Sequence, residues 1–406
     1  MFVSLCLCAR MVACVCVGVC HVCLQKLGAH QSTPRLKDFW LDSVKTKIHE
    51  LKQSKITVSL QSLTPLIKSK RAVSLSGWCT VHGRRCQLET AQFHWAGIPC
   101  VAMSPMGRRD GTDGACMSAW GAWAALRLRL QEPVIVVECS DKLDSTVLSS
   151  IFEEHYILES RILCPLQLGW VGRRRRFWGV LIHRRLIAEA FTKLGNDFIT
   201  FFARRCTATW RDFLFDTRDN INEDVLWAAK RSKSCARGMA EQVLTEDRPA
   251  FSALTEFEKI YLARYKDIRP HGIYMLNQNP AVGRGIMSSE DKVIYTFIKN
   301  NCLNWDDDAD RWLTPKEVLS LHGFPVEPRL ANPVGRARYL TSFLFNRTRP
   351  RNRNHILGQA GNSMNTMVCG AVWIYAVLFL RPKDSNAWDN ASSDLIDALK
   401  TAFQGA

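Results

Sequence analysis

The sequence predicts an α/β fold built on a doubly wound parallel sheet, because strand and helix patterns alternate along it. Residues 93–98 are typical of a strand that runs into a loop. The run PVIVV at 133–137 is β-branched without polar alternation, as in a strand covered on both faces. Residues 177–182 predict a third strand, and helical patterns over 116–130 and 142–155 separate the three. This order is typical of a parallel sheet with crossover helices.

Composition narrows the class of protein and of partner. The 406 residues are enough for one large α/β domain with insertions, or for two domains. Hydrophobic residues make up 47%, which supports a core and excludes a disordered or collagen-like chain. Lys+Arg number 54 and Asp+Glu 38, a net charge of +16. An excess of this size favours a polyanionic partner, with nucleic acid as the first candidate.

The first 23 residues alternate Val and Cys, and they admit three readings. They resemble a signal peptide whose apolar stretch is interrupted by Arg10, or a metal-binding tract. We favour a third reading, in which a gene model reads through a GT-dinucleotide repeat. The remaining cysteines are scattered singly, which is unlike a secreted disulfide scaffold, so we expect reduced thiols in the body of the protein.

The second half of the chain predicts an inserted region, followed by helices that belong to the core of the domain. Residues 183–310 are irregular and carry several arginine groups. Thr314, Pro315 and Glu317 then form a capping-box pattern that starts a helix. The apolar segment that ends near residue 380 is shorter than about twenty residues in its continuous part, so it predicts a buried helix and no membrane span.

Three candidate site elements stand next to predicted strands. Cys100 follows the first strand and Glu138 ends the second. Ligands of doubly wound sheets bind outside the carboxyl ends of the strands. The arginine run 173–176 precedes the third strand, so it need not lie at that same edge. Each element also has a plain structural reading, as an inert buried thiol, a helix-capping carboxylate and a solvated face.

Taken together and in this order, the motifs resemble those of the cytosine-5 methyltransferase family, which modifies cytosine in DNA. The proline–cysteine loop is matched by Pro99 and Cys100, and it continues with Ser104, Gly107 and a basic pair. The family's Glu-Asn-Val motif is matched by Glu138 alone, since Cys139 and Ser140 follow it.

The later motifs are matched as well. The family's Gln-x-Arg-x-Arg motif falls on residues 172–176, which keep both arginines as Arg174 and Arg176 and have Gly172 in place of the glutamine. The segment LTPKEVLSLHGFP is similar to the helix after the family's target-recognition region, and Asn362 and Ser363 resemble its final Gly-Asn motif.

The resemblance implies a Rossmann-like S-adenosylmethionine-dependent methyltransferase fold with an inserted target-recognition region. It implies that Cys100 adds to cytosine C6, that Glu138 holds the N3/N4 edge, and that Arg174 or Arg176 holds O2. Asn362 and Ser363 would line the S-adenosylmethionine pocket. DNA would be the partner, with the target base flipped out of the stack, and the nucleus would be the location.

The expected organisation follows from these matches. It begins with a low-complexity start (1–23) and a divergent or truncated cofactor portion (24–92). The catalytic core (93–182) and the target-recognition region (183–310) follow. A C-terminal part of the catalytic domain (311–382) and a tail (383–406) complete it.

The cofactor portion lacks the expected signal. No strand, glycine-rich turn and helix with a following carboxylate is found before Cys100, and residues 52–87 contain no Asp or Glu. Cys79, His82 and Cys86 do not have a standard zinc spacing, so we expect no metal. Two alternatives therefore stay open: an RNA cytosine-5 methyltransferase, and a catalytically inactive, basic DNA-binding relic. The sequence leaves the target site and the oligomeric state open.

Overall fold

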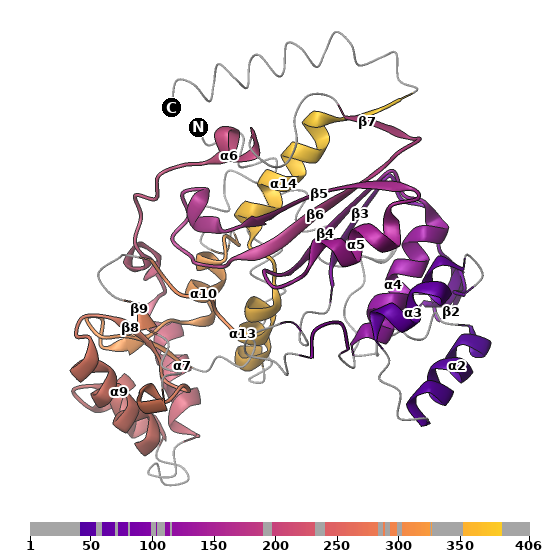
Figure 1. Ribbon diagram of the computed structural model, residues 1–406. Coiled ribbons are helices and arrows are strands. Elements are labelled where there is room, and N and C mark those ends of the chain that lie inside the picture. Colours follow the sequence, from indigo (N-terminus) through magenta and orange to yellow (C-terminus); the bar gives the residue numbers. More distant parts are fainter. Residues whose placement is uncertain are drawn as a thin grey trace. The chain divides into compact units, whose positions relative to one another are not determined.

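The computed structural model describes most of the chain from Leu41 to Lys383, in segments (Figure 1). The described residues are 41–53, 59–69, 72–79, 82–98, 103, 110–113, 116–189, 197–231, 240–282, 287–288, 293–298, 303–324, 326 and 352–383. The chain divides into two compact units. We call Met11–Leu163, Arg175–Phe202 and Ala371–Ala406 the sheet unit. We call the unit that contains Cys164–Arg174 and Ala203–Gly370 the insertion unit.

The sheet unit is built on a four-stranded sheet of order β3-β4-β6-β5. The strands are β3 (Phe93–Gly97), β4 (Val134–Ser140), β5 (Tyr156–Leu163) and β6 (Arg176–His183). Strand β4 is buried along its whole length, as its apolar run predicts. Together with the helices between the strands, this confirms the predicted α/β fold.

The prediction of an all-parallel sheet is wrong. Only β3 and β4 are parallel, whereas β6 runs antiparallel to both β4 and β5. The sequence reading missed β5, because Glu159, Ser160 and Arg161 interrupt its apolar run. The extra strand pairs with β6 over its full length and reverses the direction that an alternating strand–helix pattern predicts for β6.

Helices cover one face of this sheet. They are α2 (Asp42–Gln53), α3 (Leu60–Lys68), α4 (Met117–Leu130) and α5 (Ser145–Phe152), and the last two confirm predicted helices. Their apolar side chains form one core with Ile135, Val137 and Cys139 of β4. Asp144 caps α5 by accepting the Thr146 N–H at 2.9 Å. Before β3, the strands β1 (Ser76–Cys79) and β2 (Arg84–Gln87) form an antiparallel pair of their own.

The opposite face of the sheet is lined by tryptophans. Trp95 of β3 contacts Trp178 of β6 at 5.8 Å between ring centroids and Trp373 at 6.2 Å. Trp373 belongs to α14 (Thr366–Phe379), which confirms the predicted C-terminal helix. Short strands β7 (Ile187–Glu189) and β12 (Leu380–Pro382) pair beyond it, and α6 (Asp197–Phe202) lies in the same unit. Among the described helices, none combines the length and the apolar character needed to span a membrane.

The insertion unit contains a second four-stranded sheet, of order β11-β10-β8-β9, with short helices around it. Two hydrophobic clusters form its core. Thr314 and Glu317 form the predicted capping box at the start of α10. Its strands and α-helices are β8 (Ile273–Met275), β9 (Met287–Ser288), β10 (Asn304–Asp306), β11 (Arg311–Trp312), α7 (Arg218–Ala229), α8 (Pro249–Ser252), α9 (Glu256–Ile268), α10 (Pro315–Leu321) and α13 (Asn352–Asn362).

A buried ion pair lies next to the amino end of β4. Glu132 accepts a hydrogen bond from the Arg127 guanidinium, and its backbone carbonyl accepts one from the Tyr156 hydroxyl at 3.1 Å. Burial raises the pKa of Glu132 to about 7, and the attraction of Arg127 offsets only part of that rise. The folded protein therefore holds a proton here that the unfolded chain releases at lower pH.

Replacing Glu132 with Gln tests whether burial raises the pKa of Glu132 in the folded protein. Between the unfolded pKa of 4.5 and the folded pKa of about 7, the native state binds more protons, so its stability falls as pH rises through this window. The shift corresponds to a loss of up to about 3 kcal/mol. We expect Glu132→Gln to flatten the pH dependence of the urea midpoint between these values. Parallel curves for the two proteins would contradict the assignment.

Candidate functional site

Glu138 and Arg176 meet where β4 ends and β6 begins. The register pairs Ser140 of β4 with Arg176 of β6, so the antiparallel direction of β6 brings its first residue to the carboxyl end of β4. Arg176 Nε lies 3.2 Å from Glu138 Oε1, with 22% and 10% of the two side chains exposed. The structure thus brings together two of the residues that the sequence predicts for the site, on the edge where ligands of α/β sheets bind.

An apolar floor supports this ion pair. Glu138 lies directly opposite Trp178 in the β4–β6 ladder, so both side chains belong to one face of the sheet. Trp95 on the same face contacts Trp178. Low polarity around a charge pair strengthens its attraction and penalises either charge alone, so Arg176 and Glu138 hold one another in position.

The strand β3 leads directly to this edge. Gly97 pairs with Glu138, and the next residue, Ile98, donates its N–H to the Glu138 carbonyl at 3.0 Å. The chain then continues into the predicted loop, whose members lie outside the described residues and stay predictions: Pro99, Cys100, Ser104 and Gly107.

Arg174 has a different environment from Arg176. It belongs to the insertion unit, where its buried guanidinium donates to the carbonyls of Phe297, Gly361 and Ser363 at 3.3, 3.0 and 2.7 Å. These contacts tie the end of α13 to the strand-like segment around Phe297. The structure therefore gives Arg174 contacts that hold backbone in place, and gives Arg176 the contact with a predicted catalytic carboxylate.

Asn362 and Ser363, predicted to line a cofactor pocket, lie at the end of α13. Asn362 is exposed, and the Ser363 hydroxyl donates to the Ala360 carbonyl at 2.8 Å. The Ser363 backbone carbonyl accepts the hydrogen bond from Arg174 described above. Their role toward a cofactor stays a prediction.

The described residues before β3 do not fit a nucleoside-binding unit. Such a unit needs a strand, a glycine turn that lets a ligand approach the backbone, and a helix, followed by a ribose-binding carboxylate. Residues 41–92, where described, form α2, α3 and the antiparallel β1–β2 pair, which is a different arrangement. In the part of the sheet that the structure describes, β3 is an edge strand, with β4 as its one neighbour.

Metal binding finds no support in the described residues. Nδ1 of His82, in the turn between β1 and β2, lies 3.2 Å from Sγ of Cys86 in β2. Within the described segments, no three His, Cys, Asp or Glu side chains are grouped so that they could hold an ion.

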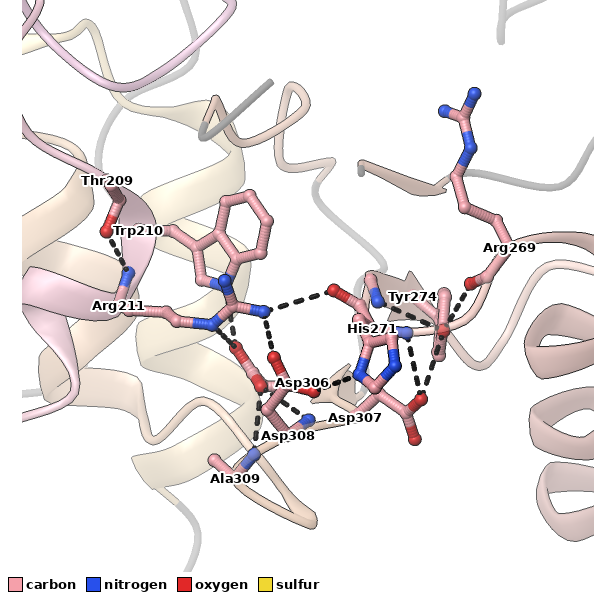
Figure 2. Close-up of polar contacts among 11 residues, drawn as sticks. Thr209, Trp210, Arg211, Arg269, His271, Tyr274, Asp306, Asp307, Asp308 and Ala309 are labelled. Atoms are coloured by element: carbon pink, nitrogen blue, oxygen red, sulfur yellow. Dashed lines mark hydrogen bonds and ion pairs between the residues drawn. The ribbon is translucent and has the colours of Figure 1, made fainter. Parts of the chain in front are cut away.

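An aspartate turn between β10 and β11 is a titratable cluster that the sequence reading missed (Figure 2). Asp306 accepts hydrogen bonds from Trp210 Nε1 at 2.6 Å and from the N–H groups of Asp308 and Ala309 at 3.0 Å each. Lys266 pairs with Asp307 at 2.5 Å, and Arg211 pairs with Asp308. The run WDDDAD at 305–310 was the available signal, but its cationic partners lie far away in the sequence.

Cations engage the carboxylates of this aspartate turn, so we interpret it as an anchor for the turn. His271 Nδ1 lies 2.7 Å from Asp308 Oδ1 (Figure 2). This hydrogen bond and the charge of Asp308 raise the pKa of His271 above its usual value.

Comparisons with known proteins find similarity among solved structures. No family model and no curated protein matches the sequence. Among solved structures, the chain is similar to the Dnmt2 methyltransferase of S. pombe, at 14% identity over 70% of this chain and 77% of that one, with a TM-score of 0.40. It is also similar to a putative prophage DNA modification methyltransferase from E. coli, at 14% identity over 71% and 79%, with a TM-score of 0.41. A methyltransferase of Entamoeba histolytica matches at 12% identity over 70% and 76%, with a TM-score of 0.35.

Arg174→Ala is expected to destabilise the insertion unit by about 2–4 kcal/mol, because it removes charge-assisted hydrogen bonds to three carbonyls. Arg174→Lys restores only part of this, since an ammonium cannot reproduce the guanidinium fork. Urea denaturation measures both. Arg185→Ala, at an exposed position, is the matched control and should change stability by less than about 0.5 kcal/mol. A loss for Arg174→Ala as small as the control's would refute the assignment.

NMR titration of His271 tests the aspartate turn. We expect its pKa to fall in the Asp308→Asn variant, because the negative charge that favours the imidazolium is removed. The stabilising contact is present at low pH and is lost as pH rises through the raised pKa. An unchanged His271 titration in this variant would show that the two side chains do not interact in solution.

Proposed function

We propose that the sheet unit carries the cytosine-activating site of a cytosine-5 methyltransferase. The single observation that carries the proposal is the Glu138–Arg176 ion pair at the edge to which β3 leads. Cys100 follows Ile98 by two residues, and two trans peptide units span at most about 7.6 Å between Cα atoms. Covalent connection therefore limits the distance of the predicted nucleophile from Ile98, whose N–H is bonded to the Glu138 carbonyl.

Three groups would divide the chemistry. The Cys100 thiolate adds to cytosine C6, which forms a C–S bond and moves the C5=C6 electron pair toward C5 and the ring. Glu138, at the N3/N4 edge, accepts a hydrogen bond from the N4 amino group as the carboxylate of the ion pair, and it donates one to N3 once it has taken up a proton from solvent. Arg176 holds O2 and keeps Glu138 in place. C5 then accepts an electrophile, its own proton passes to solvent, and the electron pair of that C–H bond re-forms C5=C6 as the thiolate leaves C6.

Arg176 takes this role in preference to Arg174. Both arginines match the motif, but Arg174 donates to three backbone carbonyls within the insertion unit. The contact of Arg176 with Glu138 is the one that the chemistry requires.

S-adenosylmethionine is the methyl donor that the resemblance implies. It would supply the electrophilic methyl group at C5. Because the described residues before β3 do not build a nucleoside unit, we derive only the cytosine side of the reaction from the structure.

DNA is the proposed substrate. The net charge of +16 favours a polyanion, and the target base has to leave the stack to reach Glu138. RNA with the same base is the competing substrate. A second candidate function is nucleic-acid binding without catalysis. It is favoured by the replacements at Cys139 and Gly172 and by the absence of a nucleoside unit among the described residues before β3.

Exchange of the cytosine C5 hydrogen with solvent tests the proposal without a methyl donor. Addition of Cys100 makes C5 basic enough to take a solvent proton, and elimination then releases the original one. We expect Cys100→Ala to reduce exchange from a DNA oligonucleotide to background, and Glu138→Gln and Arg176→Lys to reduce it by about 10²-fold or more. Cys86→Ser, in the β1–β2 pair, is the matched thiol control and should exchange as the parent does.

The outcomes separate the candidate functions. Exchange that depends on Cys100 supports cytosine activation, and methyl transfer from S-adenosylmethionine to duplex DNA or to folded RNA then identifies the substrate. Nucleic-acid binding with no exchange in the parent protein would overturn the proposal in favour of the inactive binding protein.

A further inference from the structure

Arg161 of β5 lies on the face of the sheet that carries the candidate site. The register sets Glu138 and Arg161 directly opposite Trp178, one from each side of β6. Residues opposite one another in a ladder share a face, so all three side chains belong to the tryptophan-lined face. Arg176, two residues before Trp178, belongs to it as well. Arg161 and Arg176 are therefore diagonal neighbours, about 7–8 Å apart, which is within reach of long side chains.

No described neighbour balances the charge of Arg161. The side chain is half-buried, and within the described segments its guanidinium forms no hydrogen bond or ion pair. Glu159, two residues earlier on the same face of β5, does not pair with it. Arg176 and Glu138 neutralise one another. A partly buried cation without a counter-ion is unfavourable, so this side of the site is suited to an anion.

The order of the charged groups matches the order of groups in a cytidine nucleotide. Glu138, Arg176 and Arg161 belong to β4, β6 and β5, which are consecutive in the sheet. In the proposed site, the first holds the N3/N4 edge of cytosine and the second holds O2. O2 is next to N1, which carries the sugar, so the sugar and phosphate continue from the O2 side of the base.

The spacing of the strands agrees with this order. Two strand spacings separate β4 from β5, about 10 Å in all. That distance is comparable with the span from the amino edge of cytosine to the phosphate of the same nucleotide. An anion beside Arg161 would thus lie where the phosphate of a bound cytidine nucleotide is expected.

We propose that Arg161 binds the phosphate of the nucleotide whose cytosine base lies against Glu138 and Arg176. The guanidinium presents a planar fork of donors that matches two phosphate oxygens. The inference rests on the proposed function for the position of the base. It adds that the site recognises a cytidine nucleotide through its own phosphate as well as through its base.

Fluorescence anisotropy of the full chain with a labelled single strand of deoxycytidylate tests the contact. Every base of such a strand is cytosine, and a single-stranded base leaves its stack at the lowest cost. An abasic strand of equal length keeps the phosphates and removes the base. The dissociation constant of each strand is measured over a range of salt concentrations, because the slope of log Kd against log salt counts the phosphate contacts.

Arg161→Gln is expected to weaken binding of the deoxycytidylate strand by about tenfold, because a charge-assisted hydrogen bond is lost. The salt slope should fall by about 0.7, the value for one phosphate contact of a single strand. Arg161→Lys keeps the charge and should keep the slope. Arg185→Gln, at an exposed position beyond the other end of β6, is the matched control and should change neither quantity.

Three results would overturn the inference. The first is an unchanged affinity and slope for Arg161→Gln. The second is an equal loss of affinity for the abasic strand, which would show general attraction of phosphates. The third is a parent chain that binds neither strand. An unchanged slope with aggregation of Arg161→Gln would instead assign Arg161 to the protection of β5, an edge strand in the described part of the sheet.

Hydrogen exchange at cytosine C5 separates this inference from the proposed function. Exchange that depends on Cys100, together with an unchanged salt slope for Arg161→Gln, would overturn the phosphate contact alone. A lower slope for Arg161→Gln in a protein that catalyses no exchange would support the phosphate contact and overturn the proposed catalysis.

Discussion

The antiparallel pairing of β6 with β4 is the constraint on which the candidate site depends. It places Arg176 beside Ser140 and within an ion pair of Glu138. A parallel β6 would put its first residue at the opposite edge of the sheet, about 20 Å away at 3.3 Å per residue. A slip of one residue would turn Arg176 to the other face. The strand β5 secures both direction and register by pairing with β6 over its full length.

The two arginines of one short motif have different contacts in the structure. Arg174 and Arg176 are two residues apart, yet they belong to different compact units. Arg174 satisfies backbone carbonyls of the insertion unit, which stabilises the end of α13. Arg176 forms an ion pair with a buried carboxylate, Glu138, which lies opposite Trp178 in the sheet. Both are costly to replace, but only the second contacts the predicted catalytic carboxylate.

Sequence predicts the parts of this molecule whose signals are local. The all-apolar run of β4, the helices α4, α5 and α14 and the capping box at Thr314 could be read directly. Glu138 and Arg176 could be chosen as site residues, but the choice between Arg174 and Arg176 required their side-chain contacts. The strand β5 was not predicted, because polar residues interrupt its apolar run. The aspartate turn was not predicted either, because its partners Arg211 and Lys266 come from distant segments of the chain.

Covalent capture by Cys100 is the most direct test of the central claim. An oligonucleotide with 5-azacytosine at the target position presents a more electrophilic C6, so the addition of the thiolate is more favourable than with cytosine. The account predicts a protein–oligonucleotide adduct in the intact mass, mapped by peptide analysis to Cys100, and its loss in Glu138→Gln. The absence of an adduct, or an adduct on another cysteine, would contradict the account.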